Sequence, residues 1–161
     1  MFDQIPLSKS REKNYDTLQG AFDGLIDAQE NRITNLANAS ALLYYFMDTI
    51  NWAGFYLTDE KDTLVLGPFQ GLPACTKIPF NQGVCGRAAA LQKTVIVDDV
   101  NAFEDHIACD ARSQSEIVVP LIKNGKTVGV IDIDSPEKNR FNTLDQSMLE
   151  TLAKTLVDKC W

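Results

Sequence analysis

The sequence predicts an α+β fold, in which helices from the two ends of the chain pack on a central, mainly antiparallel sheet. Apolar residues recur at helical spacing before residue 48, alternate with a period of two from Trp52 onward, and return to helical spacing after Asn142. Helices followed by consecutive strands and then by another helix are typical of this class, because the helices cover a sheet that the strands form together. The 161 residues contain no repeat and no Pro/Gly/Ser-rich linker, so we expect one domain.

This domain has three predicted parts. Residues 1–48 form an N-terminal helical segment, residues 51–135 contain the sheet and the loops of the functional site, and residues 142–160 form a closing helix. Two amphipathic helices in the first part are separated by the polar residues 30–32. Their apolar faces consist of Tyr15, Leu18, Phe22, Leu25 and Ile26 in the first helix and of Ile33, Leu36, Ala37, Ser40, Leu43 and Tyr44 in the second.

The middle part contains several short elements. Residues 52–57 and 63–66 are predicted to form a hairpin, residues 83–91 a helix with an alanine-rich face, and residues 94–97 a strand. The segment 98–110 has no periodic pattern, and long irregular loops of this kind often carry function.

The last two predicted strands, residues 117–122 and 127–134, are joined around Asn124-Gly125, which is a strong hairpin signal. The closing helix begins after Asn142 or Thr143, either of which is a suitable N-cap. Its apolar face consists of Leu144, Met148, Leu152 and Leu156.

Charge and hydropathy exclude two classes of partner. The formal net charge is -7, and no Lys/Arg cluster interleaved with aromatic residues offsets it, so nucleic acid is not expected as a partner. The longest apolar runs have about ten residues, whereas roughly 20 are needed to cross a bilayer. The first residues also lack the basic start and apolar core of a signal peptide, so we expect a cytoplasmic protein with no membrane partner.

Three carboxylates are predicted to lie on one face of the last hairpin. Asp132 and Asp134 share a face because alternate side chains of a strand point the same way, and Glu116 begins the preceding strand. Like charges this close oppose joint ionisation, so at least one carboxyl group should keep its proton and be able to donate it to an oxygen. A solvated sheet edge is the alternative for each single acid. Mg²⁺ or Ca²⁺ binding is a further alternative, but no loop has calcium-binding spacing, and no metal or cofactor is expected.

The length of the turn decides which acids face each other. A two-residue Asn124-Gly125 turn would place Glu116 opposite Ile133 and so on the other face. A three-residue loop that begins at Lys123, with Gly125 in the left-handed conformation, pairs Glu116 with Asp132. We predict this second register.

Three of the four cysteines lie beside glycine, proline or polar residues, where the backbone turns: Cys75, Cys85 and Cys109. Without a signal peptide the thiols are expected to be reduced, so a static disulfide framework is not indicated. Thiols close to acids favour redox chemistry, with buried and inert thiols as the alternative. Cys160, next to the C-terminal Trp161, is expected to be structural.

Two other uses of these cysteines are less well supported. His106 lies three residues before Cys109, but an irregular loop gives no reliable geometry for a base and its nucleophile, so we expect His106 to stabilise the loop. The spacing of the cysteines lacks the close pairs of structural zinc sites.

Cys75, Cys85, Cys109 and the three acids fall within six short segments between residues 51 and 136: NWAGFY (51–56), LGPFQGLPAC (66–75), GVCG (83–86), HIACD (106–110), SEIVVPL (115–121) and IDIDSP (131–136). Together these segments resemble one family, the free methionine-(R)-sulfoxide reductases, which are built on a GAF domain. Most GAF domains lack these cysteines and bind small ligands without changing them, so the combination is more specific than a GAF pattern alone.

The resemblance implies a GAF fold and the reduction of free methionine-(R)-sulfoxide, with thioredoxin as the reductant. Cys109 matches the nucleophile, which would form a sulfenic acid, and Cys75 matches the thiol that resolves it to an intramolecular disulfide, with Cys85 as the alternative. Dimerisation is an expectation at the family level only.

The resemblance also implies a set of substrate-binding residues. Glu116, Asp132 and Asp134 would hold the sulfoxide and the ammonium group of the substrate, with Glu116 as the acid. Trp52 would pack on the methyl group, and Tyr56 would close the same pocket, although core packing is an alternative for both rings.

Two other functions stay open at this point. A GAF-type sensor would bind a small ligand or respond to oxidation through the same thiols without turnover. A scaffold domain would dimerise through its helices, with the thiols as bystanders.

Overall fold

The structure, a computed structural model, describes residues 5–103 and 110–161 of the chain. A six-stranded antiparallel sheet with the order β3-β2-β1-β6-β5-β4 forms its centre. Its strands are β1 (Trp52–Thr58), β2 (Thr63–Gly71), β3 (Lys77–Pro79), β4 (Val95–Val97), β5 (Ser115–Lys123) and β6 (Lys126–Ser135). The helices are α1 (Arg11–Leu25), α2 (Arg32–Phe46), α3 (Gly83–Leu91) and α4 (Thr143–Cys160), with a short 3₁₀ turn at Val100–Ala102.

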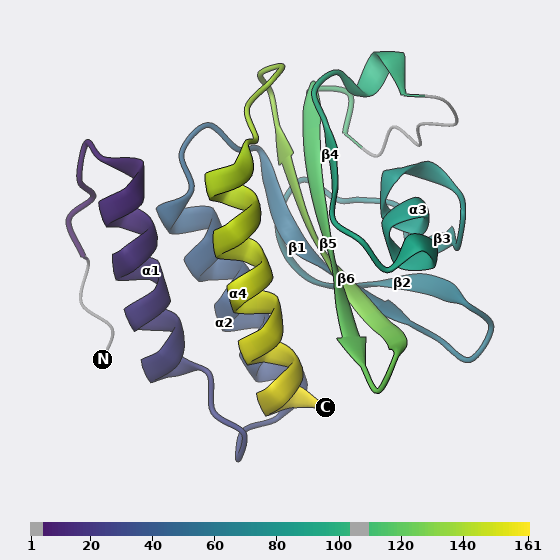
Figure 1. Cartoon of the computed structure of the whole chain (residues 1–161), viewed down its shortest axis with the longest axis horizontal. Helices are drawn as coiled ribbons and strands as arrows, with labels where there is room; N and C mark the ends of the chain where they lie inside the picture. Colours follow the sequence, from purple (N-terminus) through teal and green to yellow (C-terminus); the bar gives the residue numbers. More distant parts are fainter. Residues whose placement is uncertain (1–4, 104–109) are drawn as a thin grey trace.

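The two faces of the sheet are covered differently. Helices α2 and α4 lie against one face, α1 packs on these two helices on the side away from the sheet, and α3 lies on the other face with the connections around it (Figure 1). The first face of the sheet contributes Ala53, Phe55, Ile117, Val119, Leu121, Ile131 and Ile133 to the larger core. The second face contributes Trp52, Tyr56, Val118 and Val130 to a smaller core beneath α3. The predicted α+β fold with a mainly antiparallel sheet is therefore confirmed.

The predicted helices are present, but the buried face of α2 is rotated from the one expected. Leu36 and Leu43 are fully buried, whereas Ile33 and Tyr44 are exposed. The buried positions include Ala39, Leu42 and Phe46. This face is broader than the sequence pattern indicated, because α2 packs against α1 and also against the strands β1 and β2. The short strand β3 was not predicted, since three residues carry too little alternation to be recognised.

The predicted register of the last hairpin is wrong. The turn contains only Asn124 and Gly125, both with positive φ (51° and 74°), as a type I′ turn requires. Lys123 therefore pairs with Lys126, and the register then shifts between Leu121 and Ile122. A bulge inside the strand, rather than a longer turn, supplies the extra residue.

Because of this bulge, Glu116 pairs with Asp134, and neither with Asp132, as predicted, nor with Ile133. The alternation of faces is preserved, because a register error of two residues returns each side chain to the same face. Glu116, Asp132 and Asp134 thus lie on one face, as the sequence predicted.

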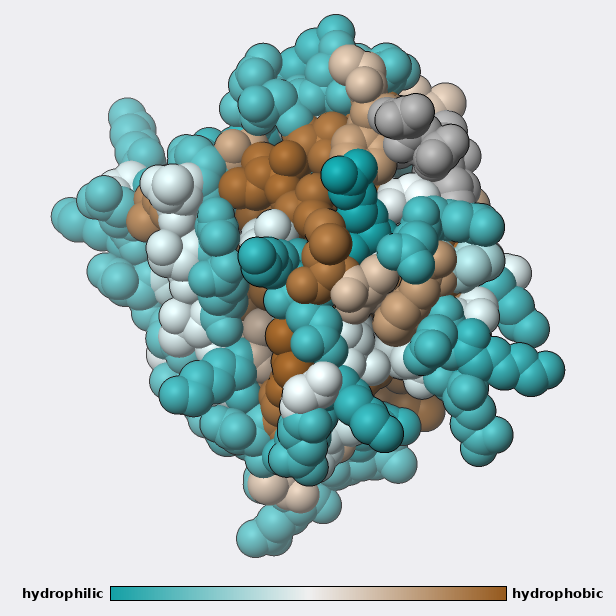
Figure 2. All heavy atoms as spheres, turned by 45° about the vertical axis from the view of Figure 1, so that its right-hand side comes forward, coloured by the Kyte–Doolittle hydropathy of each residue, from teal (hydrophilic) through white to brown (hydrophobic). Residues whose placement is uncertain are grey.

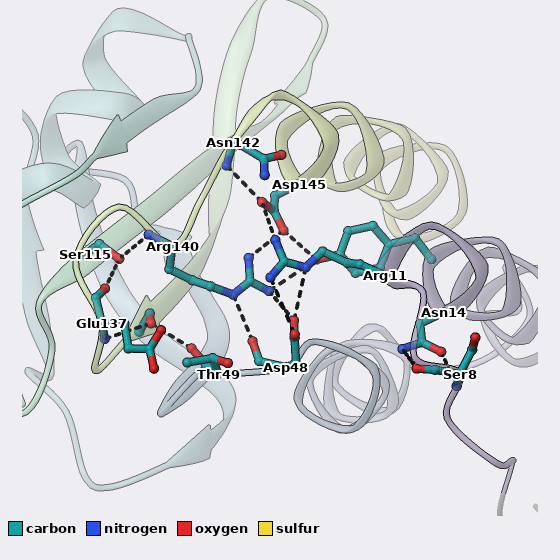
Figure 3. Close-up of polar contacts among 12 residues, drawn as sticks. Ser8, Arg11, Asn14, Asp48, Thr49, Ser115, Glu137, Arg140, Asn142 and Asp145 are labelled. Atoms are coloured by element: carbon teal, nitrogen blue, oxygen red, sulfur yellow. Dashed lines mark hydrogen bonds and ion pairs between the residues drawn. The ribbon is translucent and has the colours of Figure 1, made fainter.

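A network of charged side chains connects the helical layer to the ends of β5 and β6 (Figure 3). Arg140 is almost fully buried and donates to Asp145 Oδ1 at 2.8 Å and to Asp48 Oδ1 at 2.9 Å. Tyr15 on α1 also donates to Asp145, and Arg11 forms an ion pair with Asp48 at 3.2 Å. The network therefore balances two guanidinium groups against two carboxylates.

Replacing Asp145 with alanine should lower the free energy of unfolding by about 3–5 kcal/mol, because it removes the buried one of the two carboxylates that pair with the buried Arg140. The same carboxylate accepts from the backbone N–H of Asn142 in the capping box of α4. Urea unfolding followed by circular dichroism measures the loss. Asp158→Ala, an exposed acid on the same helix, is the control and should change stability by less than about 0.5 kcal/mol. A loss below 1 kcal/mol for Asp145→Ala would contradict the argument.

Of the helices that the structure describes, none has the length and apolar character needed to cross a membrane. The face seen in Figure 2 is mostly hydrophilic, with a band of hydrophobic residues across its centre.

Candidate active site

The three predicted acids meet across the middle strands of the sheet. Asp134 on β6 pairs with Glu116 on β5 and with Trp52 on β1, so these residues form one row across the sheet. Asp132 lies in the next row on the same face, opposite Gly54 of β1. The antiparallel pairing of three strands therefore sets the spacing of the acids.

Helix α3 covers this face and closes a small cavity over the acids. The cavity has a volume of about 30 Å³, which accommodates only one or two water molecules. A larger molecule therefore enters only after lining side chains move. The lining residues are Tyr56, Ile78, Gly83, Val84, Cys85, Asp110, Ser113, Glu116, Asp132 and Asp134.

The acids and Cys85 form a buried, negatively biased cluster. The Cys85 thiol donates to Glu116 Oε1 at 3.8 Å, and no Lys or Arg among the described residues forms an ion pair with Glu116, Asp132 or Asp134. Burial, and then the charges of Asp132 and Asp134, raise the pKa of Glu116 well above its usual value. Burial also raises the pKa of Asp132, to about 6.

The pKa values of Asp134 and Cys85 are raised as well. Partial burial and the charge of Asp132 raise the pKa of Asp134. Burial, and then the charges of Asp132 and Glu116, raise the pKa of the Cys85 thiol well above its usual value. The cavity therefore favours the protonated forms of Glu116 and of the Cys85 thiol.

Asp110 is a lining residue that the sequence analysis did not select. Arg112 binds it with Nη2 at 2.7 Å from Oδ2, and the Asn51 amide donates to the same oxygen at 2.9 Å. These contacts, chiefly those of Arg112, lower the pKa of Asp110 to about 2. Asp110 is thus an ionised carboxylate in the same cavity lining as Glu116, whose pKa is raised. Its position in the segment HIACD (106–110) could have indicated a functional role, but nothing in that segment distinguished it from an ordinary acidic residue in a loop.

The aromatic residues Trp52 and Tyr56 lie next to each other on β1. Trp52 is buried and stacks on Phe69 and on Tyr56, with ring centroids 5.3 and 5.9 Å away, and its Nε1 donates to Leu72 O at 3.1 Å. Only Tyr56 of the two lines the cavity. Gly54 makes room for this stack, since a Cβ there would lie 2.4 Å from Phe69 Cβ and 2.8 Å from the Trp52 ring.

The cysteines have different surroundings. Cys85 and Cys160 are free thiols, the first in the cavity and the second half-buried on α4, where Asn35 donates to its sulfur at 3.6 Å. Cys75, in the connection from β2 to β3, is disulfide-bonded. Cys109, like His106, lies outside the described residues, so their predicted roles are not tested by the geometry.

One group of side chains in the described part of the chain has the geometry to hold a metal ion. Cys85 Sγ and one carboxylate oxygen each from Glu116 and Asp132 lie within 4.8 Å of one another.

Comparisons with known proteins agree with this architecture. Residues 39–158 match the family model of the GAF domain. The free methionine-R-sulfoxide reductase of Saccharomyces cerevisiae is 48% identical over 94% of this chain and 88% of its own length. That of Escherichia coli is 49% identical over 88% of this chain and 86% of its own.

A solved structure extends the likeness to three dimensions. The free methionine-R-sulfoxide reductase of Neisseria meningitidis, determined in complex with its substrate, superposes with a TM-score of 0.92 at 43% identity, covering 98% of this chain and 95% of that one. The curled antiparallel sheet with its helices is a GAF fold. The chain belongs to the family of free methionine-R-sulfoxide reductases.

Proposed function

We propose that the protein reduces free L-methionine-(R)-sulfoxide to L-methionine, with Cys109 as the nucleophile and thioredoxin as the reductant. The observation that carries this proposal is the likeness over nearly the whole chain to a reductase that was solved with its substrate. The raised pKa of Glu116 in the cavity supports it independently, because sulfoxide reduction needs a proton at the departing oxygen.

In the proposed mechanism the Cys109 thiolate attacks the sulfoxide sulfur while Glu116 donates a proton to the oxygen. Methionine leaves as the thioether, and the oxygen remains on Cys109 as a sulfenic acid. The Cys75 thiol then attacks this sulfur, which releases water and forms the disulfide. A dithiol of the thioredoxin type reduces the disulfide and returns both thiols.

The surroundings of the other thiols favour this assignment. Cys85 is buried beside two carboxyl groups, and its raised pKa disfavours the thiolate that attack requires. Cys160 lies on α4, among residues of the helical layer. Because Cys85 and Cys160 are free while Cys75 is disulfide-bonded, we propose Cys75 rather than Cys85 as the resolving residue.

We assign substrate binding to residues that line the cavity and to Trp52, which stacks on the lining residue Tyr56. Tyr56 and the Trp52 beneath it are proposed to contact the methyl end of the substrate, while Asp132 and Asp134 bind its polar groups. The small, enclosed cavity favours a free amino acid over a peptide. Asp110 joins this set as the proposed partner of the ammonium group, since its carboxylate is the one that is held ionised.

Replacing Asp110 with asparagine should raise KM by roughly 10- to 100-fold, the value of one charge-assisted hydrogen bond, and leave kcat nearly unchanged. Steady-state kinetics with the free sulfoxide measures the effect. Asp99→Asn is the control, because Asp99 lies on the same connecting segment but pairs with Lys138 instead of lining the cavity. An unchanged KM would exclude Asp110 as the ammonium site.

The function is tested by following consumption of the free (R)-sulfoxide in the presence of thioredoxin, thioredoxin reductase and NADPH. We expect turnover of this isomer and little turnover of the (S)-isomer or of N-acetylated, peptide-like substrates. Binding of the sulfoxide without turnover would overturn the enzyme assignment in favour of a sensor domain. The same assay with dithiothreitol as reductant separates a failure of thioredoxin from a failure of the reaction. Dimerisation and a cytoplasmic location stay predictions.

A further inference from the structure

The cluster of Cys85, Glu116 and Asp132 combines one sulfur and two oxygen ligands on three different elements. Cys85 lies on α3, Glu116 on β5 and Asp132 on β6, and all three side chains are buried. Their ligand atoms lie within 4.8 Å of one another. Helix packing and strand pairing therefore hold the three atoms in place, and no flexible loop is needed to bring them together.

A second observation is an unpaired carboxylate oxygen within this cluster. Asp132 Oδ1 is buried and has no hydrogen-bond partner in the described part of the chain. Asp132 as a whole is only 6% exposed and lines the cavity. Buried carboxylate oxygens are normally paired with donors or bound to metal, and no Lys or Arg of the described residues reaches this one.

The ligand types select a thiophilic cation. Mg²⁺ and Ca²⁺ take six or more oxygen ligands, whereas Zn²⁺ takes mixed sulfur and oxygen ligands with a coordination number of four. Zn–S and Zn–O bonds of about 2.3 and 2.1 Å place the two ligand atoms about 3.6 Å apart at a tetrahedral angle. The observed distance from Cys85 Sγ to Glu116 Oε1 is 3.8 Å, so little movement is required.

We propose that Cys85, Glu116 and Asp132 bind a thiophilic divalent cation of the Zn²⁺ type, with water as the fourth ligand. The cavity of about 30 Å³ has room for the ion and that water. Binding displaces the protons of the Cys85 thiol and of the Glu116 carboxyl group to solvent and involves no redox step. Since the ion fills the space in which the sulfoxide is proposed to react, it competes with the substrate; this consequence rests on the proposed function, whereas the binding itself does not.

Titration of the full-length protein with Co²⁺ tests the site, because a thiolate ligand gives a sulfur-to-cobalt charge-transfer band. The protein is used with the Cys75 disulfide formed and without substrate. We expect one equivalent of Co²⁺ with this band in the wild type and in the Cys160→Ser control, and displacement of the Co²⁺ by Zn²⁺.

Cys85→Ser should lose the band, and Asp132→Asn should weaken binding by at least about 100-fold, since changes around a metal site cost about 10- to 100-fold even beyond the ligands. Two variants at different elements keep the test meaningful if one of them folds poorly. Absence of the band in the wild type, or its persistence in Cys85→Ser, would overturn the site. A protein that binds Co²⁺ as described but does not turn over the sulfoxide would support the site and contradict only the proposed function.

Discussion

Replacing Cys109 with serine should abolish reduction of the free (R)-sulfoxide, with a loss in kcat of roughly 10⁴-fold or more, as for the removal of other catalytic nucleophiles. A serine hydroxyl stays protonated near neutral pH and cannot take the oxygen as a sulfenic acid. Neither of the two free thiols among the described residues is suited to replace Cys109, because Cys85 is buried with a raised pKa and Cys160 lies in the helical layer. The measurement is methionine release under single-turnover conditions, which does not depend on the reductant.

Two matched variants separate the nucleophile from the resolving thiol. Cys160→Ser should keep full activity. Cys75→Ser should release one equivalent of methionine per protein and then stop with thioredoxin, because the sulfenic acid forms but no intramolecular disulfide follows. Steady-state activity of Cys75→Ser with thioredoxin would indicate that Cys85 resolves instead. Wild-type methionine release by Cys109→Ser would refute the nucleophile assignment.

Replacing Glu116 with glutamine should lower kcat by about 10²- to 10⁴-fold, the usual contribution of a general acid. Glutamine retains the shape and can still accept the Cys85 hydrogen bond, but it has no acidic proton for the departing oxygen. Burial and the neighbouring carboxylates raise the pKa of Glu116, which keeps the acid protonated to higher pH than an ordinary glutamate. The wild-type kcat should therefore fall as the pH rises through that pKa.

The pH profile separates an acid role from a structural one. The alkaline fall of kcat should disappear in Glu116→Gln, because the variant has no proton to lose at this position. Glu150→Gln, at an exposed position on α4, is the control and should leave both kcat and the profile unchanged. A Glu116→Gln enzyme with reduced kcat but the wild-type pH profile would show that another group donates the proton.

Local signals predicted much of the fold. The helix at residues 83–91 has the predicted bounds, and Asn142 caps α4 as one of the two residues expected. These features depend on neighbours in sequence, namely periodicity, cap chemistry and the Asn124-Gly125 turn. The exposed Ile33 and Tyr44 on α2 could not be predicted, because the packing of that helix on distant strands decides which of its apolar residues are buried.

The candidate site, like the fold, was predicted only in part. The alternation of side chains along a strand placed Asp132 and Asp134 on one face. Glu116 lies on that face in every register that differs from the predicted one by an even number of residues. The partner of Glu116 was not predictable, because the bulge between Leu121 and Ile122 has no distinct sequence signature. Asp110 was missed because its contact with the cavity depends on how the segment before β5 lies against the sheet.

The sequence by itself determined that this protein is an α+β reductase of the GAF class, with three acids on one face of a hairpin and with thiols near them. Only the tertiary structure decided that Glu116 faces Asp134, that Cys85 lies against these acids, and which carboxylates hold protons. The physical reason is that periodicity and turn chemistry act between sequence neighbours. Burial and electrostatic shifts depend instead on side chains that meet only when β1, β5, β6 and α3 pack together.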